Sequence, residues 1–265
     1  MSALTSTSWT APRIRKLKGK EKVVVLTAYD YTLARWMDEA GVQMVLVGDS
    51  LGMTVLGYET TLPVTLEHML HHTAAVTRAV KSAMVITDMP FMSYQVSVEQ
   101  ALANAGRCVQ EAGAAGVKVE GGAFRGPVIR GLVENGIPVL GHIGLLPQSV
   151  HAMGGYRMQG KTDADAERLI ADAKAVEEAG AFAVVLEGMP AEVGRAVTEA
   201  VSIPTIGIGA GPDCDGQVLV VNDLLGLTEK PPSFAKAYAR LGEEARSAFA
   251  EYVREVRDGT FPGRA

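Results

Sequence analysis

Apolar runs alternate with amphipathic stretches along almost the whole chain, and this pattern predicts eight strands separated by helices. The runs are short and nearly continuous, which is typical of strands buried on both faces of a sheet. We expect strands at 23–29, 44–49, 84–88, 117–120, 138–143, 182–187, 205–208 and 217–221. We expect helices at 11–20, 33–40, 65–80, 97–113, 128–134, 164–179, 191–201 and 233–256, the last with or without a break near Gly242.

Several helix ends can be read directly from the sequence. Ser97 is a natural N-cap with Gln100 at the capping-box position, and Thr65 is a suitable cap although a Ser/Thr-x-x-Glu box is absent. Gly41 and Gly136 close helices, because glycine tolerates the left-handed conformation of a helix end.

The alternation runs on without a linker, so residues 23–265 are predicted to form one (β/α)8 (TIM) barrel domain with a C-terminal helix. Residues 1–22 are predicted to form an N-terminal segment with a short helix. An open, doubly wound sheet is the alternative, and it predicts a Gly-x-Gly-x-x-Gly turn after the first strand. The chain has Thr27-Ala28-Tyr29-Asp30 there, which favours the barrel.

Bulk properties narrow the class of protein. The chain has 265 residues, a net charge of −5 and two cysteines. This charge does not favour nucleic acid or an anionic membrane as a partner, and two cysteines suit a reducing compartment. No apolar run approaches the roughly 20 residues of a membrane span. The first twenty residues lack acids, as transit peptides do, but a basic helix facing water explains them more simply. We therefore expect a soluble cytoplasmic protein.

Carboxylates recur at the ends of the predicted strands. Three helices end in Glu-Ala-Gly, and each is followed by an apolar run that stops at an acid: Asp49, Glu120 and Glu187. Asp88 ends a fourth run. The C-terminal ends of barrel strands meet at one mouth, so these acids are expected to converge there. Lys118 lies two residues before Glu120 and therefore shares its face, and His142 is expected to face the same opening.

The chemistry of this cluster favours Mg²⁺. Carboxylates without a cysteine or a histidine pair form an oxygen-only ligand set, which suits Mg²⁺ better than zinc or copper. A 2-oxo acid can chelate such an ion, Lys118 can neutralise its negative charge, and Glu187 remains as general base. His68, His71 and His72 also share a helix face, but contact with neighbouring elements explains them more simply. The glycine-rich stretch 144–161 is either a lid with its hinge at Gly154-Gly155-Tyr156 or an ordinary turn.

Longer strings of residues resemble one enzyme family, the ketopantoate hydroxymethyltransferases. The resemblance covers about Val25 to Pro262. The strings are Ala28-Tyr29-Asp30-Tyr31, Leu46 to Met53, Thr61 to Thr65, Asp88 to Met92, Val117 to Gly122, Gly141 to Leu145 with Pro147-Gln148-Ser149, Gly154-Gly155-Tyr156, Leu186-Glu187 and Ile206 to Gly211.

The resemblance implies a barrel of the phosphoenolpyruvate/pyruvate superfamily and a defined reaction. A hydroxymethyl group passes from 5,10-methylenetetrahydrofolate to 3-methyl-2-oxobutanoate by aldol-type enolate addition, giving 2-dehydropantoate in the first step of pantothenate biosynthesis. The family also implies one Mg²⁺ per subunit and a large homo-oligomer, commonly a decamer.

The resemblance assigns roles by position. Asp49, Asp88 and Glu120 match Mg²⁺ ligands; Asp49, Ser50, Asp88 and Lys118 match oxo-acid contacts; Glu187 matches the proton acceptor; and His142 matches a histidine near the substrate, its role open. Gly188 and Pro212-Asp213-Cys214 depart from the family pattern, which leaves the folate contacts open.

Two other functions remain as alternatives. One is another Mg²⁺-dependent oxo-acid lyase or mutase of the same superfamily. Those relatives use a cysteine in a lid loop, and residues 144–161 contain none. The other is a non-catalytic oligomeric barrel, which would not need the five charged residues together.

Overall fold

A computed structural model describes residues 8–263 of the chain. It divides into two compact units, one ending at Val218 and one beginning at Leu219. Residues 1–7 of the predicted N-terminal segment lie outside the described residues. No helix within residues 8–263 is long and apolar enough to cross a membrane.

Eight parallel strands form a closed barrel in chain order, which confirms the predicted fold. The strands are β1 Val23–Thr27, β2 Met44–Val47, β3 Met84–Asp88, β4 Gly116–Glu120, β5 Val139–Gly144, β6 Ala183–Glu187, β7 Thr205–Ile208 and β8 Gly216–Leu219. Their register pairs Asp88 with Lys118 and Glu120 with His142. Residues distant in sequence are therefore neighbours at one end of the barrel.

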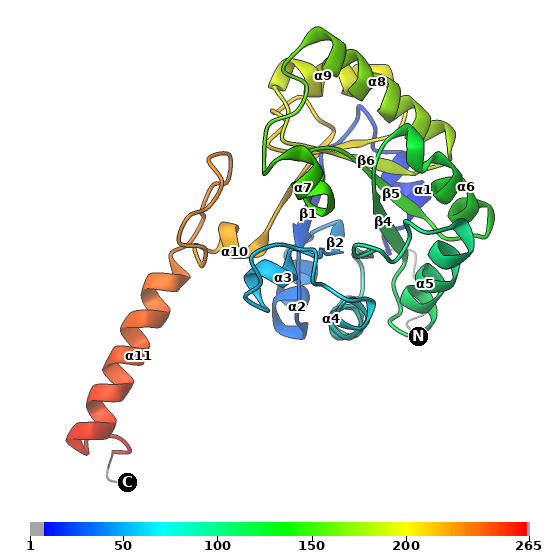
Figure 1. Cartoon of the computed structure of the whole chain (residues 1–265). Helices are drawn as coiled ribbons and strands as arrows, with labels where there is room; N and C mark the ends of the chain where they lie inside the picture. Colours follow the sequence, from blue (N-terminus) through cyan, green and yellow to red (C-terminus); the bar gives the residue numbers. More distant parts are fainter. Residues whose placement is uncertain (1–7, 264–265) are drawn as a thin grey trace. The chain divides into compact units, whose positions relative to one another are not determined.

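The longer helices of the first unit lie outside these strands (Figure 1). They are α2 Tyr31–Glu39, α4 Leu66–Ala79, α5 Val98–Gln110, α6 Gly126–Glu134, α8 Asp163–Glu178 and α9 Ala191–Ala200. The shorter helical segments of this unit are α1 Ala11–Arg15, α3 Leu51–Thr54, η1 Ala123–Arg125, η2 Pro147–Ser149 and α7 Val150–Met153. The second unit holds α10 Val221–Leu224 and α11 Leu241–Asp258.

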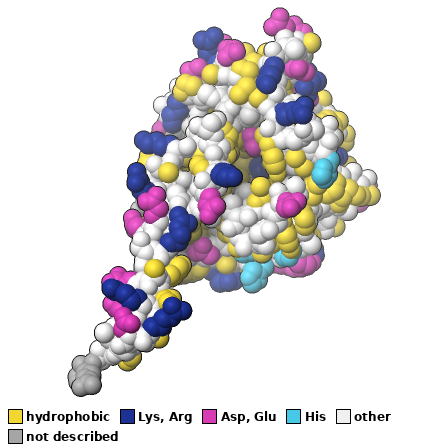
Figure 2. Space-filling view, turned by 60° about the vertical axis from the view of Figure 1, so that its left-hand side comes forward, with side chains coloured by type: hydrophobic (Ala, Val, Ile, Leu, Met, Phe, Trp, Pro, Cys, Tyr) yellow, Lys and Arg dark blue, Asp and Glu magenta, His cyan; other side chains and the backbone are white. Residues whose placement is uncertain are grey.

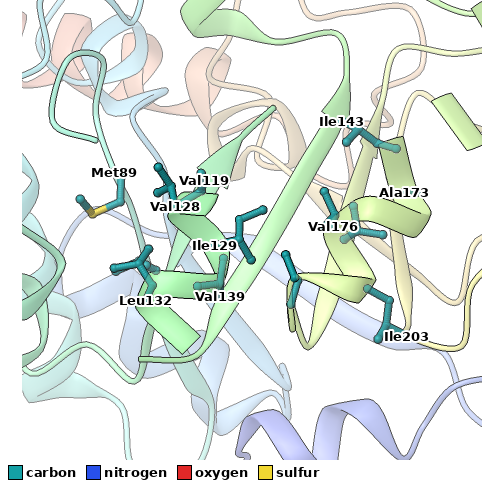
Figure 3. Close-up of a cluster of buried hydrophobic side chains, with 14 of the residues drawn as sticks. Met89, Val119, Val128, Ile129, Leu132, Val139, Ile143, Ala173, Val176 and Ile203 are labelled. Carbon is teal, nitrogen blue, oxygen red and sulfur yellow. The ribbon is translucent and has the colours of Figure 1, made fainter. Parts of the chain in front are cut away.

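Successive side chains of each strand point alternately outward and inward, and they form two separate hydrophobic cores. Val117 and Val119 of β4 belong to the cluster between the strands and the outer helices, whose members from α6 and α8 include Ile129 and Val176 (Figure 3). The other cluster combines inward residues of seven strands: Val23, Val25, Met44, Leu46, Met84, Ile86, Leu140, Ala183, Val185, Ile206 and Val218. Ile14 of α1 joins this second core and is fully buried. Because side chains alternate along a strand, the residues that continue this inner face at the strand ends point into the mouth.

Helix caps agree with the sequence pattern in part. Ser97 accepts a hydrogen bond from the backbone N–H of Gln100, as predicted for an N-cap. The Gln100 side chain accepts from the N–H of Val96 instead of closing a box with Ser97. Thr65 does form a reciprocal box, with His68 taking the place of the usual glutamate.

Two predicted helices are shorter than expected. The first, predicted at 11–20, ends at Arg15 and continues as turns closed by bonds of the i→i+3 type up to Lys20. The last, predicted to begin at residue 233, begins only at Leu241. The N–H groups of Tyr238 and Leu241 donate to the carbonyls of Leu224 and Leu225. Those N–H groups are therefore not available for helical bonds across residues 233–240.

Exposed apolar side chains gather on the loops that follow strands. Met53, Phe91, Met92, Phe124 and Tyr156 are each at least 39% exposed and lie after β2, β3, β4 or β5. Figure 2 shows hydrophobic side chains interspersed with acidic and basic ones over the face that it presents.

Candidate active site

Charged side chains meet at the C-terminal ends of the strands. Asp88, Glu120 and Glu187 are the last residues of β3, β4 and β6, and Asp49 follows β2 by two residues. Lys118 continues the inner face of β4, and His142 that of β5. All but Glu187 are at most 4% exposed, and the Glu187 side chain is 17% exposed. The structure thus brings together the acids that the strand-end pattern singles out.

Lys118 lies at the centre of the cluster. Its Nζ is 2.7 Å from Oδ1 of Asp88, 3.7 Å from Oε1 of Glu120 and 3.1 Å from Nδ1 of His142. His142 links this lysine to the edge of the site, since its Nε2 lies 3.2 Å from Oε2 of Glu187. A continuous chain of polar contacts therefore runs from Asp88 to Glu187.

The buried charges alter one another's protonation. Burial, with the negative charges of Asp88 and Glu120, raises the pKa of Asp49 well above its usual range. Burial also raises the pKa of Asp88, although Lys118 opposes this. For Glu120 burial is outweighed by Lys118 and His142, so its pKa is lowered. Three carboxylates therefore compete for one lysine and one histidine.

The same acids raise the pKa values of the two basic groups. Burial alone would lower the pKa of Lys118, but the carboxylates of Asp88, Glu120 and Asp49 raise it above its usual value. Burial and Lys118 would lower the pKa of His142, yet the nearby carboxylates of Glu120 and Glu187 raise it to about 9. A lysine that forms an imine with a carbonyl must first lose its proton, so this environment favours an electrostatic role for Lys118.

Ser50 lies beside the acids at the start of α3. Its hydroxyl lies 2.8 Å from that of Tyr29, which follows β1 and is buried. Gly48 leaves room for this arrangement, because a Cβ there would lie 2.8 Å from Oγ of Ser50 and 3.4 Å from Oδ2 of Asp88. The N–H of Asp49 donates to the same Asp88 oxygen, which ties the turn after β2 to the end of β3.

Sequence reasoning missed two residues that complete the cluster, Gln148 and Tyr94. Both are at most 5% exposed, and the Tyr94 hydroxyl donates to Oε1 of Gln148. The Gln148 side-chain amide donates to Oδ2 of Asp49, and its backbone N–H donates to Oε2 of Glu120. Tyr94 lies in a loop and Gln148 in the three-residue helix η2, and neither segment is long enough for periodicity to reveal burial. The string Pro147-Gln148-Ser149 was the only available signal.

The donor set fits a magnesium ion in its chemistry. Oδ1 of Asp88 and Oε1 of Glu120 are buried and lie 2.7 and 3.7 Å from the Lys118 ammonium, but neither accepts a hydrogen bond of good geometry within the described part of the chain. Burial and mutual repulsion raise the pKa values of Asp49 and Asp88, and a bound cation would offset that repulsion and favour their ionised forms. No three His, Cys, Asp or Glu side chains in residues 8–263 form a ready-made metal site. Mg²⁺ commonly takes only one or two carboxylates and fills its shell with water and substrate oxygens, so the residues present still suit it.

The three helical histidines make structural contacts. His68 closes the cap of α4, Nδ1 of His72 lies 2.7 Å from the carbonyl oxygen of Tyr29, and His71 packs edge-on against the ring of His72. The simpler interpretation of this group is therefore supported.

The loop after β5 reaches back over the mouth. Tyr156 is half exposed, and its hydroxyl lies 3.6 Å from the sulfur of Met53 on α3. Partial burial, with the charges of Asp49, Glu187 and Glu120, raises the pKa of Tyr156, so its hydroxyl lies within electrostatic reach of the cluster. Gly154 and Gly155 precede it with φ of 68° and 112°. The lid with a hinge at these glycines remains a prediction.

Known proteins resemble this chain in sequence and in fold. Residues 8–264 match the family model described as ketopantoate hydroxymethyltransferase. A 3-methyl-2-oxobutanoate hydroxymethyltransferase from Syntrophus aciditrophicus (strain SB) is 58% identical over 251 residues, 94% of this chain and 92% of that protein.

Solved structures of other enzymes share the fold. A 2,3-dimethylmalate lyase of the PEP mutase/isocitrate lyase superfamily superposes with a TM-score of 0.64 at 18% identity, covering 99% of this chain and 91% of that one. A phosphonopyruvate hydrolase complexed with oxalate and Mg²⁺ gives a TM-score of 0.64 at 14% identity, covering 96% and 89%. At these identities the likeness concerns the fold alone.

Proposed function

The chain belongs to the ketopantoate hydroxymethyltransferase family, and we propose that the charged cluster at its barrel mouth carries out the family's reaction. The chain is a transferase that moves a hydroxymethyl group from 5,10-methylenetetrahydrofolate to 3-methyl-2-oxobutanoate, forming 2-dehydropantoate in the first step of pantothenate biosynthesis. The observation that carries the assignment of the site is the buried chain of contacts from Asp88 through Lys118 and His142 to Glu187.

Asp49, Asp88 and Glu120 are proposed to hold one Mg²⁺ per subunit. Their carboxylate oxygens would hold the ion, and water and substrate oxygens would complete its shell. When bound, the ion withdraws electron density from the 2-oxo group of the substrate and so acidifies the hydrogen on C3.

The chain's own residues position the oxo acid and stabilise its charge. Asp49, Ser50, Asp88 and Lys118 are proposed to contact 3-methyl-2-oxobutanoate. The Lys118 ammonium, kept charged by its neighbours, opposes the negative charge that develops on the 2-oxo oxygen as the C3–H bond breaks. Burial strengthens this interaction because little water screens it.

Glu187 is proposed as the base that removes the C3 proton. It is the most exposed acid of the cluster, and Nε2 of His142 lies 3.2 Å from its Oε2. This contact orients the carboxylate and leaves Oε1 for the substrate. C3 then bonds to the methylene carbon of the folate as one of that carbon's two bonds to nitrogen breaks. Water then displaces the second nitrogen and supplies the hydroxyl oxygen of the product, and the two nitrogens take up the C3 proton and one proton of the water.

Deuterium exchange at C3 of 3-methyl-2-oxobutanoate tests this assignment, because it requires substrate, metal and base but no folate. We expect Mg²⁺-dependent exchange by the wild type and a fall of about 10²–10⁴-fold in E187Q, the usual range for loss of a general base. E192Q, at an exposed glutamate in the first turn of α9, is the matched control and should exchange normally. E187Q exchanging at the wild-type rate would show that another group is the base.

The nearest alternative is a lyase or mutase of the same superfamily. Burial raises the pKa of Cys108 to about 12 and also raises the pKa of Cys214, so neither thiol suits nucleophilic or acid catalysis. Turnover that requires methylenetetrahydrofolate separates the two functions. A lyase would cleave its substrate without it.

We also propose a cytoplasmic homo-oligomer, a decamer by family. Both cysteines are unpaired, which suits a reducing compartment. Phe249, Tyr252, Val253 and Val256 of α11 are 43–68% exposed and recur at i, i+3, i+4 and i+7. Such a stripe on one helix face is typical of a surface that another subunit covers. Analytical ultracentrifugation tests the assembly.

A further inference from the structure

Gln148 is buried within the cluster and is a neutral side chain that contacts its acids directly. We propose that Gln148 is a positioning residue, which fixes the carboxylates of Asp49 and Glu120 for metal and substrate. This role rests on the proposed function of the site, but it concerns a residue to which neither the sequence pattern nor the family resemblance gives a part.

Every polar atom of the Gln148 side chain is used. Its amide nitrogen donates to Oδ2 of Asp49 and to the carbonyl oxygen of Met89, both at 2.9 Å. Its Oε1 accepts from the Tyr94 hydroxyl at 2.7 Å and from Nε2 of Gln95 at 3.1 Å. The amide nitrogen faces two acceptors, so a flipped amide would lose the bonds to Asp49 and Met89 and the bond from Gln95, whereas the Tyr94 hydroxyl could accept instead of donate. The orientation of this side chain is therefore fixed by its partners.

Gln148 connects the ends of four strands. It lies just after β5, while its partners Asp49, Met89 and Glu120 lie at or after the ends of β2, β3 and β4. Tyr94 strengthens the link to β4, because its hydroxyl also accepts from the N–H of Glu120 at 3.2 Å. One residue thus links two acids at or just after the ends of β2 and β4, strands that are not neighbours in the sheet.

These bonds also select which carboxylate oxygens remain for a ligand. Gln148 occupies Oδ2 of Asp49 through its side chain and Oε2 of Glu120 through its backbone N–H. Oε1 of Glu120 is left facing Lys118 and His142. Partners of this kind, which orient the groups that touch a metal, typically change metal affinity or activity by 10–100-fold when lost.

A purely structural role is the competing explanation, and Gln43 provides the matched control. Gln43 is also 5% exposed, and its side chain accepts from the N–H of Val24 and donates to Glu21. It precedes β2, at the end of the barrel opposite the cluster. Replacing either glutamine by methionine keeps the side-chain length and removes the amide.

The experiment compares Q148M, Q148E and Q43M with the wild type. Three quantities are measured: Mg²⁺ affinity by calorimetric titration with MgCl2 alone, kcat and KM for folate-independent C3 exchange, and the midpoint of urea unfolding. For Q148M we expect Mg²⁺ affinity and exchange kcat each to fall 10–100-fold, with a smaller change in KM. Q148E should lose more, because its carboxylate would face Asp49 and the Met89 carbonyl. Q43M should lower only the unfolding midpoint.

The outcomes separate the inference from the function on which it rests. Q148M that matches Q43M in Mg²⁺ affinity and exchange kcat overturns the positioning role, whatever its stability. A wild type that shows no exchange, combined with weakened Mg²⁺ binding in Q148M, would refute the proposed reaction while supporting the role of Gln148 in arranging the acids.

Discussion

Gly144 contacts the backbone of the proposed base, Glu187, so we expect its replacement by alanine to lower both stability and C3 exchange. Gly144 ends β5 with φ of 96° and lies beside Glu187 in the barrel register. An added Cβ would lie 2.2 Å from the Glu187 carbonyl oxygen. Real Cβ contacts essentially never fall below 3.0 Å, so the two strands must separate locally by at least 0.8 Å (3.0 − 2.2).

The magnitude follows from two contributions. A left-handed conformation costs a residue other than glycine about 1–2 kcal/mol, and overpacking costs a further ~1–3 kcal/mol. The Glu187 carbonyl cannot turn away freely, because it accepts a hydrogen bond from Leu145 at 2.8 Å. Gly136 is the matched control, since its φ is 84° but a Cβ there would meet nothing within 4 Å. G136A should therefore show only the conformational cost, and G144A should be less stable than G136A by about 1–3 kcal/mol.

The same displacement of the Glu187 backbone should also lower the rate of C3 exchange. A shift of about 1 Å in a reacting group can lower a rate by about 10²-fold, so C3 exchange should fall by roughly that factor in G144A and remain normal in G136A. Urea unfolding and deuterium exchange measure the two effects. If G144A equals G136A in stability and exchanges at the wild-type rate, the reasoning from the Gly144–Glu187 contact is wrong.

Two further predictions concern stability. Asp215 accepts hydrogen bonds from Lys18 and from the backbone N–H of Thr205, and these outweigh burial and lower its pKa. The ionised Asp215 therefore stabilises the folded state fully above the unfolded pKa near 4. This stabilisation is lost as the pH falls through the lower pKa of the folded state. D215N should lower the free energy of unfolding by about 2 kcal/mol at pH 7. In acid titrations the unfolding free energy of D215N should fall less steeply below pH 4 than that of the wild type. The same steepness in both proteins would contradict this prediction. T65A removes the capping box with His68 and should lower the unfolding free energy by about 1 kcal/mol. T65S keeps the hydroxyl and should retain most of that stability. Equal losses in the two variants would show that the hydroxyl does not stabilise α4.

The acids of the site were largely predictable from the sequence, because strand geometry is local. The period of two places Lys118 and Glu120 on one face, and an apolar run that stops at Asp88, Glu120 or Glu187 marks the end of a strand. Asp49 was placed at the end of its strand but lies two residues beyond it, held by the bond from its N–H to Asp88.

The sequence failed where long-range contacts override local preference. Residues 233–240 have good helix formers, yet the N–H groups of Tyr238 and Leu241 pair with an earlier segment, so α11 starts later. The Thr65 box was missed because histidine can replace glutamate as the reciprocal acceptor. Gln148 and Tyr94 were missed because nothing in a loop sequence distinguishes a buried polar side chain from an exposed one.

The sequence by itself determined the strand–helix alternation, the two faces of each strand and the acids at the strand ends, since these follow from short-range geometry and burial. Only the tertiary structure decided which oxygen each acid presents and which neutral side chain orients it. Those details depend on contacts between segments as far apart as Asp49 and Gln148, which form only when the barrel closes.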